Sequence, residues 1–420
     1  MMKRLLPIVI ASMALVAASC SNDDKSSDAT SKPADTAAPG DTSAPADTTA
    51  PGDTTAPSDC ALDAPLKIGF AADLGELGAF SDQPGSDAAQ VMVDQINAAG
   101  GVGGQQVEYV VKDIQGDPAA AQRGAQELLD EGVNALIGPP FASTGAPLLD
   151  SVDGQVPIVF MASTDPALAD PSRGAFLASF SDQVQSSAIA EFALGKGYTT
   201  AVTLSSPDDV YFSGNPEYFT DAFTHGGGTV LQDYSFSLAD ADFSTQVNAI
   251  AGLSEQPDVL FTAMVMGQTQ TLLEQLDAAG LGDIVVMGVD GFDATVVWSA
   301  GAVADGVFFA AHTFPQDSNG VEEFLASAAA AGKTIETISF GALAADAVQI
   351  IAAAVTEACS LDGPTISAAI DNLVDLPVVT GSVTYKGTGG VPEKDVVILT
   401  VEGGEPVFVE ALRPAYIAGS

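Results

Sequence analysis

The segment 96–113, INAAGGVGGQQVEYVVKD, contains four glycines in five positions, a density typical of loops that bind phosphate. The four are Gly100, Gly101, Gly103 and Gly104. A phosphate loop of the Rossmann or P-loop type follows a strand and opens a helix, because the helix N-terminus supplies the N–H groups. Here a helical pattern precedes the glycines and a strand pattern follows them. We therefore expect these glycines to end a helix and turn the chain.

The other combinations that suggest chemistry also lack the required context. The sequence GKT at 332–334 lacks the glycine that a P-loop places five residues before Gly332, since Ser327 stands there. No G-x-S-x-G nucleophile elbow occurs. The two histidines, His225 and His312, have no Cys, His or acidic neighbour at metal-ligand spacing. The sequence therefore indicates neither an enzyme nor a metal site, and we expect no cofactor.

Composition narrows the class further. The chain has 55 acidic against 13 basic residues, which gives a formal net charge of −42. Such a charge argues against binding to nucleic acid and against electrostatic binding to anionic lipid. After residue 59 about 360 residues remain. That length exceeds one comfortable core and suggests two domains.

The N-terminus is typical of an exported chain. A basic start is followed by an apolar run over 5–18 and then by Cys20, which predicts a signal peptide over 1–19. The run is short for a membrane span, which needs about 20 apolar residues. The segment VAASC resembles a bacterial lipobox with Cys20 as the lipidated residue. The alternative is an ordinary cleaved signal peptide with an incidental cysteine.

Residues 20–59 have a different composition, with repeated Ala, Pro, Thr and Asp. Such a segment buries too little apolar surface to offset its ordering entropy, and proline keeps it extended. We expect a disordered linker that holds a folded domain off the outer face of the cell membrane.

Apolar strands alternate with helices through the rest of the chain. Strand patterns lie at 66–72, 106–113, 133–140 and 156–163, with helical patterns at 87–100 and 117–132 between them. The alternation starts again after 176–183 and continues to a strand at 283–289. Alternating β and α elements with apolar strands predict parallel sheets covered by helices on both faces. The expected fold class is α/β, with two doubly wound lobes.

The order of these segments resembles the type I periplasmic binding proteins, in particular the branched-chain amino acid (Leu/Ile/Val) substrate-binding proteins of ABC transporters. The resemblance is carried by INAAGGVGGQQVEYVVKD, DPAAAQRGAQELLDEGVNALIGP, VPIVFMASTDPAL, DFSTQVNAI, LLEQLDAAGL, VMGVDGF and ALAADAVQIIAAAV. It implies a monomeric capture protein that binds a small molecule between two lobes and meets permease subunits.

The resemblance also implies three crossovers between the lobes. They are expected near 179–183, 311–314 and 377–381. Lobe 1 then comprises 60–181 and 313–378, and lobe 2 comprises 182–312 and 379–412. In this division the segment GSVTYKG (381–387) belongs to lobe 2.

An amino acid ligand needs N–H groups and hydroxyls for its carboxylate, best supplied at a helix N-terminus. The loop PPFASTG offers Ser143 and Thr144, and the loop MASTDP offers Ser163 and Thr164. The resemblance assigns the carboxylate to these loops and the ammonium to the backbone carbonyl of Ala162. The first hydroxyl position of the family's loop is alanine here. Helix capping alone also explains such residues.

The resemblance places an acid at the end of the last strand of lobe 2, and Asp290 stands there to accept the ammonium. A turn-forming Asp-Gly pair is the alternative. The side-chain pocket is assigned to Phe80, Tyr211, Val265 and Phe340, where Val265 replaces an aromatic residue and suggests a wider pocket. Ordinary core packing is the alternative for each of these four.

Two cysteines remain after lipidation, Cys60 and Cys359. An exported chain meets an oxidising compartment, so we expect a disulfide between them; two buried free thiols are the alternative. The ligand also stays open. Short amides, urea-like compounds and aromatic acids are alternatives to an amino acid, and a ligand-sensing receptor is an alternative to transport.

Overall fold

The computed structural model describes residues 60–75 and 77–419. These residues belong to one compact unit, Pro57–Ser420. The expected signal peptide, Cys20 and the linker lie outside the described residues.

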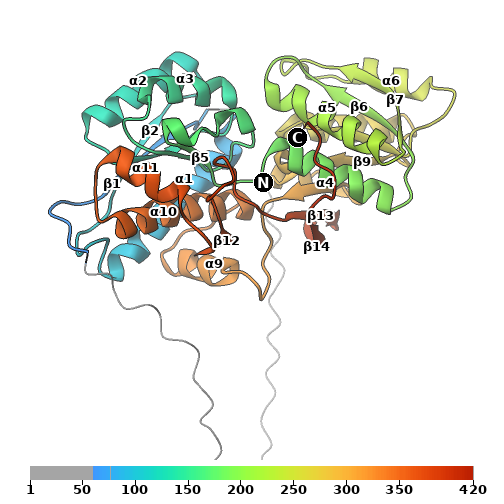
Figure 1. The fold of residues 1–420 in the computed structure, drawn as a ribbon. Coiled ribbons are helices and arrows are strands. Elements are labelled where there is room, and N and C mark those ends of the chain that lie inside the picture. The colour runs from blue at the N-terminus through green and yellow to red at the C-terminus, as the bar shows by residue number, and fades with distance from the viewer. Residues whose placement is uncertain (1–59, 76, 420) are drawn as a thin grey trace, which may run out of the picture. The chain divides into compact units, whose positions relative to one another are not determined.

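The first sheet is parallel, with strand order β2-β1-β3-β4-β5. Its strands are β1 (Lys67–Ala72), β2 (Glu108–Asp113), β3 (Ala135–Gly138), β4 (Ile158–Phe160) and β5 (Ala175–Leu177). Its helices are α1 (Ala79–Ala98), α2 (Pro118–Asp130), α3 (Ala142–Val152), α9 (Val321–Ala330), α10 (Ile338–Ala358) and α11 (Gly363–Asp371). Figure 1 shows that blue and orange-red segments, far apart in sequence, share this lobe.

Strand β1 shows how the sequence forms two cores in this lobe. Successive strand residues point to opposite faces of a sheet. Ile68 and Phe70 pack in a core with residues of α1 and α10, whereas Ala71 packs in a core with residues of α2 and α3. The nearly continuous apolar strand is therefore buried on both faces, as is expected for a parallel sheet covered by helices.

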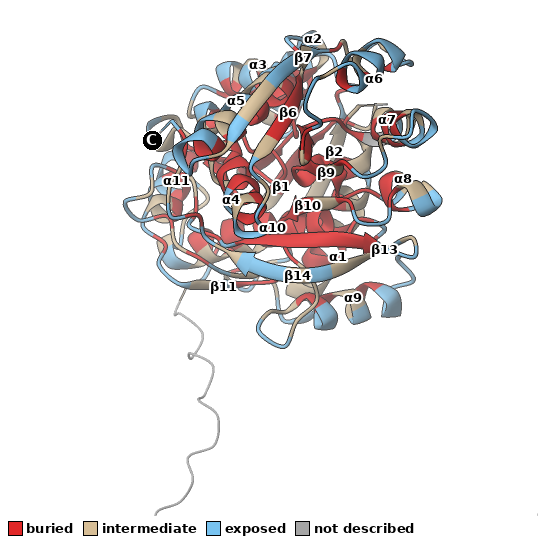
Figure 2. Ribbon diagram, turned by 90° about the vertical axis from the view of Figure 1, so that its right-hand side faces the viewer, coloured by how far each residue is buried: buried red, intermediate tan, exposed pale blue. Residues whose placement is uncertain are grey.

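The second sheet has the order β14-β13-β10-β9-β8-β6-β7. Its strands are β6 (Thr200–Ser205), β7 (Thr229–Ser235), β8 (Val259–Thr262), β9 (Val285–Gly288), β10 (Phe308–Ala311), β13 (Val396–Glu402) and β14 (Glu405–Leu412). Its helices are α4 (Asp182–Gly195), α5 (Val210–His225), α6 (Ser244–Ala251), α7 (Met266–Ala278) and α8 (Thr295–Trp298), with 3-10 turns η3 (Asp290–Phe292) and η4 (Gly301–Val303). Strand β13 is antiparallel to both β10 and β14. Figure 2 shows that β13 is buried, whereas β14, the edge strand beside it, is more exposed.

The structure corrects the place of the segment 381–387. Strand β12 (Gly381–Val383) pairs antiparallel with β11 (Leu376–Val378), and Val383 lies in the core of the first lobe. Tyr385 holds the segment there, since its hydroxyl donates to the carbonyl of Leu177 at 2.6 Å. The expectation that this segment belongs to the second lobe was wrong, and the chain enters the second sheet only at β13.

A disulfide and a buried helix connect parts of the first lobe that are far apart in the sequence. Cys60, before β1, forms a disulfide with Cys359 at the end of α10, with Cα atoms 5.4 Å apart. Helix α10 is the one helix of the described residues that is long and apolar enough to cross a membrane, yet 83% of its most apolar window is buried inside the protein. It packs against α1 as the central helix of its core.

Candidate functional site: a buried acidic cluster between the lobes

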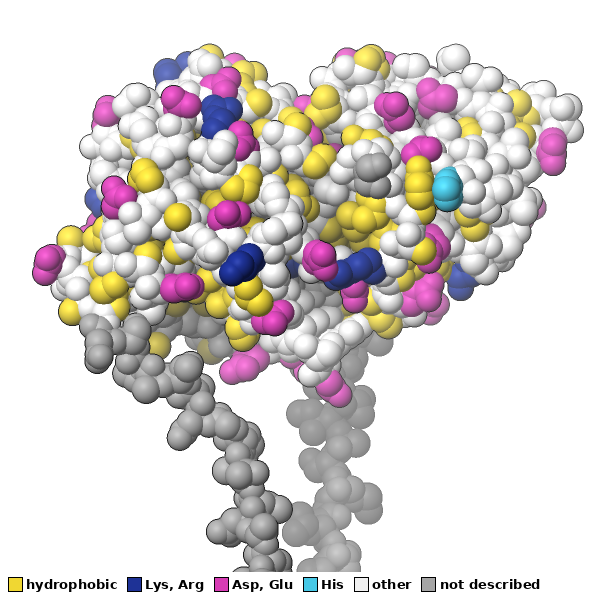
Figure 3. All heavy atoms as spheres, viewed as in Figure 1, with side chains coloured by type: hydrophobic (Ala, Val, Ile, Leu, Met, Phe, Trp, Pro, Cys, Tyr) yellow, Lys and Arg dark blue, Asp and Glu magenta, His cyan; other side chains and the backbone are white. Residues whose placement is uncertain are grey.

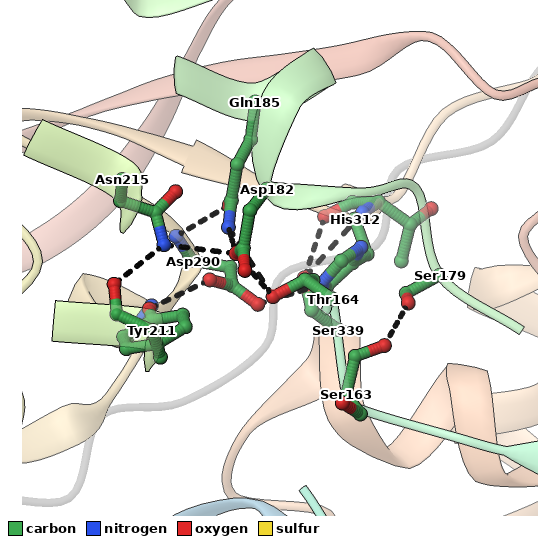
Figure 4. Close-up of polar contacts among 12 residues, drawn as sticks. Ser163, Thr164, Ser179, Asp182, Gln185, Tyr211, Asn215, Asp290, His312 and Ser339 are labelled. Carbon is green, nitrogen blue, oxygen red and sulfur yellow. Dashed lines mark hydrogen bonds and ion pairs between the residues drawn. The ribbon is translucent and has the colours of Figure 1, made fainter. Parts of the chain in front are cut away.

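Asp290 and His312 meet at one edge of the second sheet. Asp290 follows β9 and His312 follows β10, and these strands are parallel neighbours. The carboxyl ends of such strands lie at the same edge, so the two side chains approach each other. The Nε2 atom of His312 lies 2.9 Å from Oδ2 of Asp290, and the hydroxyl of Tyr211 donates to Oδ1 at 2.8 Å (Figure 4). Asp290 is only 3% exposed. Tyr211 and His312 are therefore partners of this carboxylate within the chain.

Tyr211 is positioned by the start of α5. Asp209 caps this helix, since its Oδ1 accepts from the N–H of Tyr211. The Tyr211 hydroxyl also accepts from the N–H of Gly291 at 2.9 Å. A Cβ atom at Gly291 would stand 2.6 Å from a methyl of Val265 and 2.7 Å from the Tyr211 oxygen. Val265 is buried, and it lies so close to Gly291 that only glycine fits there.

Thr164 connects the first lobe to this cluster through Asp182. The Thr164 hydroxyl donates to Oδ1 of Asp182 at 2.6 Å, and Asn215 donates to the same oxygen at 2.8 Å. Gln185 donates to it as well, while its own amide oxygen accepts from the N–H of Asp290. Thr164 follows β4, Asp182 begins α4 at the first crossover, and Asn215 lies on α5. The network therefore joins the two lobes (Figure 4).

The charge of this cluster is poorly compensated. Burial raises the pKa of Asp182 to about 7. The charge of Asp290 raises it further, whereas the hydrogen bonds from Thr164 and Asn215 lower it. Burial also raises the pKa of Asp293 to about 7, with Ser339 opposing the shift and the charge of Asp290 adding to it. Burial lowers the pKa of His312, although Asp290 opposes the shift, so the imidazole is a neutral partner. Across residues 60–75 and 77–419, no lysine or arginine forms an ion pair with Asp182, Asp290 or Asp293.

Ser163 and Ala162 lie in the loop after β4. Ala162 is buried, and the carbonyl of Ser163 accepts from the Ser179 hydroxyl. The Ser163 hydroxyl is itself buried without a hydrogen-bond partner, as is Nδ1 of His312. Buried polar atoms in native proteins almost always have a partner, protein or water. These two atoms are therefore free to bind a water or a ligand, although Figure 4 shows Ser163 apart from the Asp290 cluster.

The loop before α3 places its two predicted residues differently. Thr144 is buried, and its hydroxyl donates to the carbonyl of Phe141, so it stabilises the first helical turn. Ser143 is exposed, and its N–H donates to Oδ2 of Asp209 in the second lobe at 3.3 Å. Thus one candidate has a local structural partner and the other contacts the opposite lobe.

Phe80 and Phe340 form an edge-to-face pair with ring centroids 5.2 Å apart. Phe80 is half-buried and packs against the cores of both lobes, whereas Phe340 is fully buried. Phe80 also lines a hollow of about 450 Å³ between the start of α1 and residues 294–296 of the second lobe. Figure 3 shows acidic side chains over both lobes on the face of the molecule seen in Figure 1, and few basic ones.

Several residues of the site were missed by sequence reasoning. They are Phe141, Asp182, Gln185, Asp209, Asn215, Asp293 and His312. A usable signal existed for His312, because it directly follows an apolar strand of the same sheet as Asp290. For the helix residues 182, 185 and 215 no motif distinguishes them from surface polar residues. No group of three or more His, Cys, Asp or Glu within the described part of the chain could hold a metal ion.

The family model for periplasmic binding proteins matches residues 65–405. The chain belongs to this family, whose members are substrate-binding proteins and not enzymes. Within it, the chain resembles the type I periplasmic binding proteins of the branched-chain amino acid family, which serve ABC transporters.

Among relatives, the Leu/Ile/Val-binding protein BraC3 of Rhizobium johnstonii is 27% identical over 354 residues, which cover 83% of this chain and 94% of that protein. The fold resembles the leucine binding protein LivK of Thermotoga maritima, with a TM-score of 0.75, 24% identity and coverage of 83% and 99%. It also resembles a solute binding protein of R. palustris in complex with benzoate, with a TM-score of 0.73, 21% identity and coverage of 84% and 98%.

Proposed function

We propose that the chain captures an amino acid between its two lobes and delivers it to an ABC permease. The observation that supports an amino acid over an aromatic acid is the buried acidic cluster. Asp182, Asp290 and Asp293 lie buried without a lysine or arginine partner among the described residues. A ligand with an ammonium group offsets this charge, whereas a ligand that is only anionic adds to it.

In this proposal the ligand carboxylate binds at the first turn of α3, near Ser143 and Thr144, and at the hydroxyls of Ser163 and Thr164. The first N–H groups of α3 suit an anion, because the helix has no side-chain cap of its own. The ammonium binds between the carbonyl of Ala162 and the acidic cluster. In the same proposal the side chain of the ligand contacts Phe80, Tyr211, Val265 and Phe340.

The test compares ligands that differ by one charged group. Calorimetry and thermal shift with L-leucine, leucinamide, 4-methylpentanoate and benzoate separate the contributions of ammonium and carboxylate. A ligand at 100 times its Kd stabilises the protein by about 2.7 kcal/mol. We expect leucine to bind more tightly than 4-methylpentanoate, which lacks only the ammonium. Tighter binding of benzoate or 4-methylpentanoate than of leucine would overturn the amino acid proposal.

Asp290→Asn tests the charge of the cluster directly. Removing one partner of a buried charge pair typically costs about 2–5 kcal/mol, which corresponds to about 30- to 5,000-fold in affinity. Because Asp290 also binds Tyr211 and His312, the unfolding free energy is measured for the same variant. A folded variant with unchanged leucine affinity would show that Asp290 is only structural.

Delivery and anchoring complete the proposal. A lipid on Cys20 and an extended linker would hold the binding domain near the permease on the outer face of the membrane. Mass spectrometry of the membrane fraction should find diacylglycerol on Cys20, and Cys20→Ala should release the protein. Uptake of the ligand by cells should fall when the gene is deleted. Normal uptake with loss of a transcriptional response to the ligand would favour a sensing receptor instead.

A further inference from the structure

One carboxylate accepts from two helix N-termini that belong to different lobes. Asp209 caps α5 in the second lobe, with Oδ1 accepting from the N–H of Tyr211 at 3.0 Å. Its Oδ2 accepts from the N–H of Ser143, the second residue of α3 in the first lobe, at 3.3 Å. Both helices therefore direct their positive ends toward one half-buried carboxylate.

The contact is reinforced by an aromatic residue beside it. Phe141 precedes α3, and its ring packs at 5.8 Å from Tyr211 and 5.9 Å from Phe212, both on α5. Although Phe141 belongs to the chain of the first lobe, it is buried in the core of the second. The lobes thus touch at the two residues on either side of Ala142.

Helix α3 needs an acceptor that its own sequence does not supply. Phe141 occupies the N-cap position, where Ser, Thr, Asp or Asn would normally accept from the first free N–H groups. Asp209 satisfies the N–H of Ser143 from across the lobe boundary. This N–H is also one that the ligand carboxylate takes in the proposed function.

We propose that Asp209 is an interlobe latch that closes the unliganded protein and occupies the place of the ligand carboxylate, so that the ligand must displace it. This inference rests on the proposed function for the identity of the ligand but not for the latch itself. It makes Asp209 a residue that sets affinity without contacting the bound ligand. A competing internal carboxylate lowers the apparent affinity by the fraction of molecules in which it is released.

A second carboxylate, that of Asp165, opposes closure of the latch. Asp165, in the first lobe, has a raised pKa, mainly through burial and further through the charge of Asp209. Closing the latch therefore brings two carboxylates toward each other, which opposes the attraction of the two helix N-termini. Asp165→Asn should remove this repulsion and favour the closed unliganded form.

Two substitutions separate the latch from the cap of α5. Asp209→Asn keeps one acceptor oxygen for α5, but its amide nitrogen cannot accept from Ser143. Asp209→Ser keeps an N-cap residue for α5 and is too short to reach α3. Asp117→Asn is the matched control, because Asp117 caps α2 within the first lobe alone.

The unliganded proteins are compared by small-angle scattering and by hydrogen exchange of a peptide that covers Ser143. We expect both Asp209 variants to show a larger radius of gyration and faster exchange, with Asp117→Asn unchanged. The contact between Asp209 and Ser143 is comparable to one helix-cap hydrogen bond, which contributes about 0.5–2 kcal/mol. Its loss should therefore tighten leucine binding about 2- to 30-fold.

Each outcome decides one part of the inference. Unchanged scattering and exchange in both Asp209 variants would overturn the latch. Opening without tighter leucine binding would overturn the competition with the ligand. If leucine binds to none of the proteins and the Asp209 variants still open, the latch stands and the amino acid proposal fails.

Discussion

Nε2 of His312 lies 2.9 Å from Oδ2 of Asp290, and this is the only histidine–carboxylate pair at such a distance among the described residues. The His312 ring is held from both sides, since it stacks on Phe180 at 4.0 Å and meets Phe340 edge-on at 5.9 Å. The pair therefore fixes the second crossover to the end of β9.

His312→Ala should destabilise the protein, because Asp290 would lose a buried donor. The expected loss in unfolding free energy is about 1–3 kcal/mol, or more if the carboxylate stays charged. His312→Gln should recover part of it, since its amide can donate to Asp290. Urea unfolding compares both variants with the parent protein. An unchanged unfolding free energy in His312→Ala would show that the pair contributes nothing.

Asp182 should make stability depend on pH. Its pKa rises from 3.8 unfolded to about 7 folded, chiefly through burial. The folded state therefore binds more protons between about pH 4 and pH 7, so this contribution is complete below pH 4 and is lost as the pH rises through 7. Each pKa unit corresponds to about 1.36 kcal/mol. Asp182→Asn imitates the protonated form, so relative to the parent protein it should be nearly neutral below pH 4 and should stabilise more at pH 8 than at pH 5. The unfolding free energy at both pH values tests this; an equal effect at both would contradict it.

Lys394 should anchor the third crossover. Its Nζ donates to Asp346 of α10 at 3.1 Å and to the Thr380 hydroxyl at 2.9 Å, and it is buried. Lys394→Met leaves the carboxylate of Asp346 buried without a cation and should cost about 3–5 kcal/mol.

The control for this change is Lys386→Met, an exposed lysine of the same segment. Adding Asp346→Asn to Lys394→Met should restore part of the stability, because no buried charge remains. Failure of the second substitution to restore stability would show that packing, and not charge, holds the crossover. Thermal and urea unfolding measure all three proteins.

Removing the disulfide should destabilise the first lobe. Cys60 and Cys359 are separated by 299 residues, and a bridge between distant residues restricts the unfolded chain. The Cys60→Ser/Cys359→Ser double variant should lose about 2–5 kcal/mol. Reductant should lower the melting temperature of the parent protein toward that of the double variant and leave the variant unchanged. Equal melting temperatures of the oxidised parent and the variant would contradict the prediction.

The fold class was predictable because its evidence is local. Apolar strands alternate with amphipathic helices, and capping residues such as Asp117 before Pro118 are visible in the sequence. The start of α1 was less visible: it begins at Ala79, eight residues before the predicted start at Asp87, and contains Pro84. A proline followed by glycine indicates a break, and only packing against α10 overrides it.

The site was predictable only where it follows strand ends. Asp290 and Thr164 were predicted because each follows a strand in the apolar pattern, and the structure places both in the buried acidic cluster. Asp182 and Asn215 contribute through a network whose members come from different lobes, and sequence spacing carries no information about such distances. The misplaced segment 381–387 has the same cause, since Tyr385 reaches Leu177 across 208 residues.

The path of the chain through the first lobe has a consequence for biosynthesis. Its sheet is complete at β5, but α9, α10 and α11, which cover one face, come only after strands β6 to β10 of the second lobe. A nascent chain that has emerged as far as β10 therefore exposes the apolar side of α1 and of the sheet. We expect β6 to β10 and their helices to acquire stable structure first during translation or export, before β13 and β14 complete the second sheet. The first lobe can close only when α10 arrives, and the cysteine at its end then becomes available to Cys60.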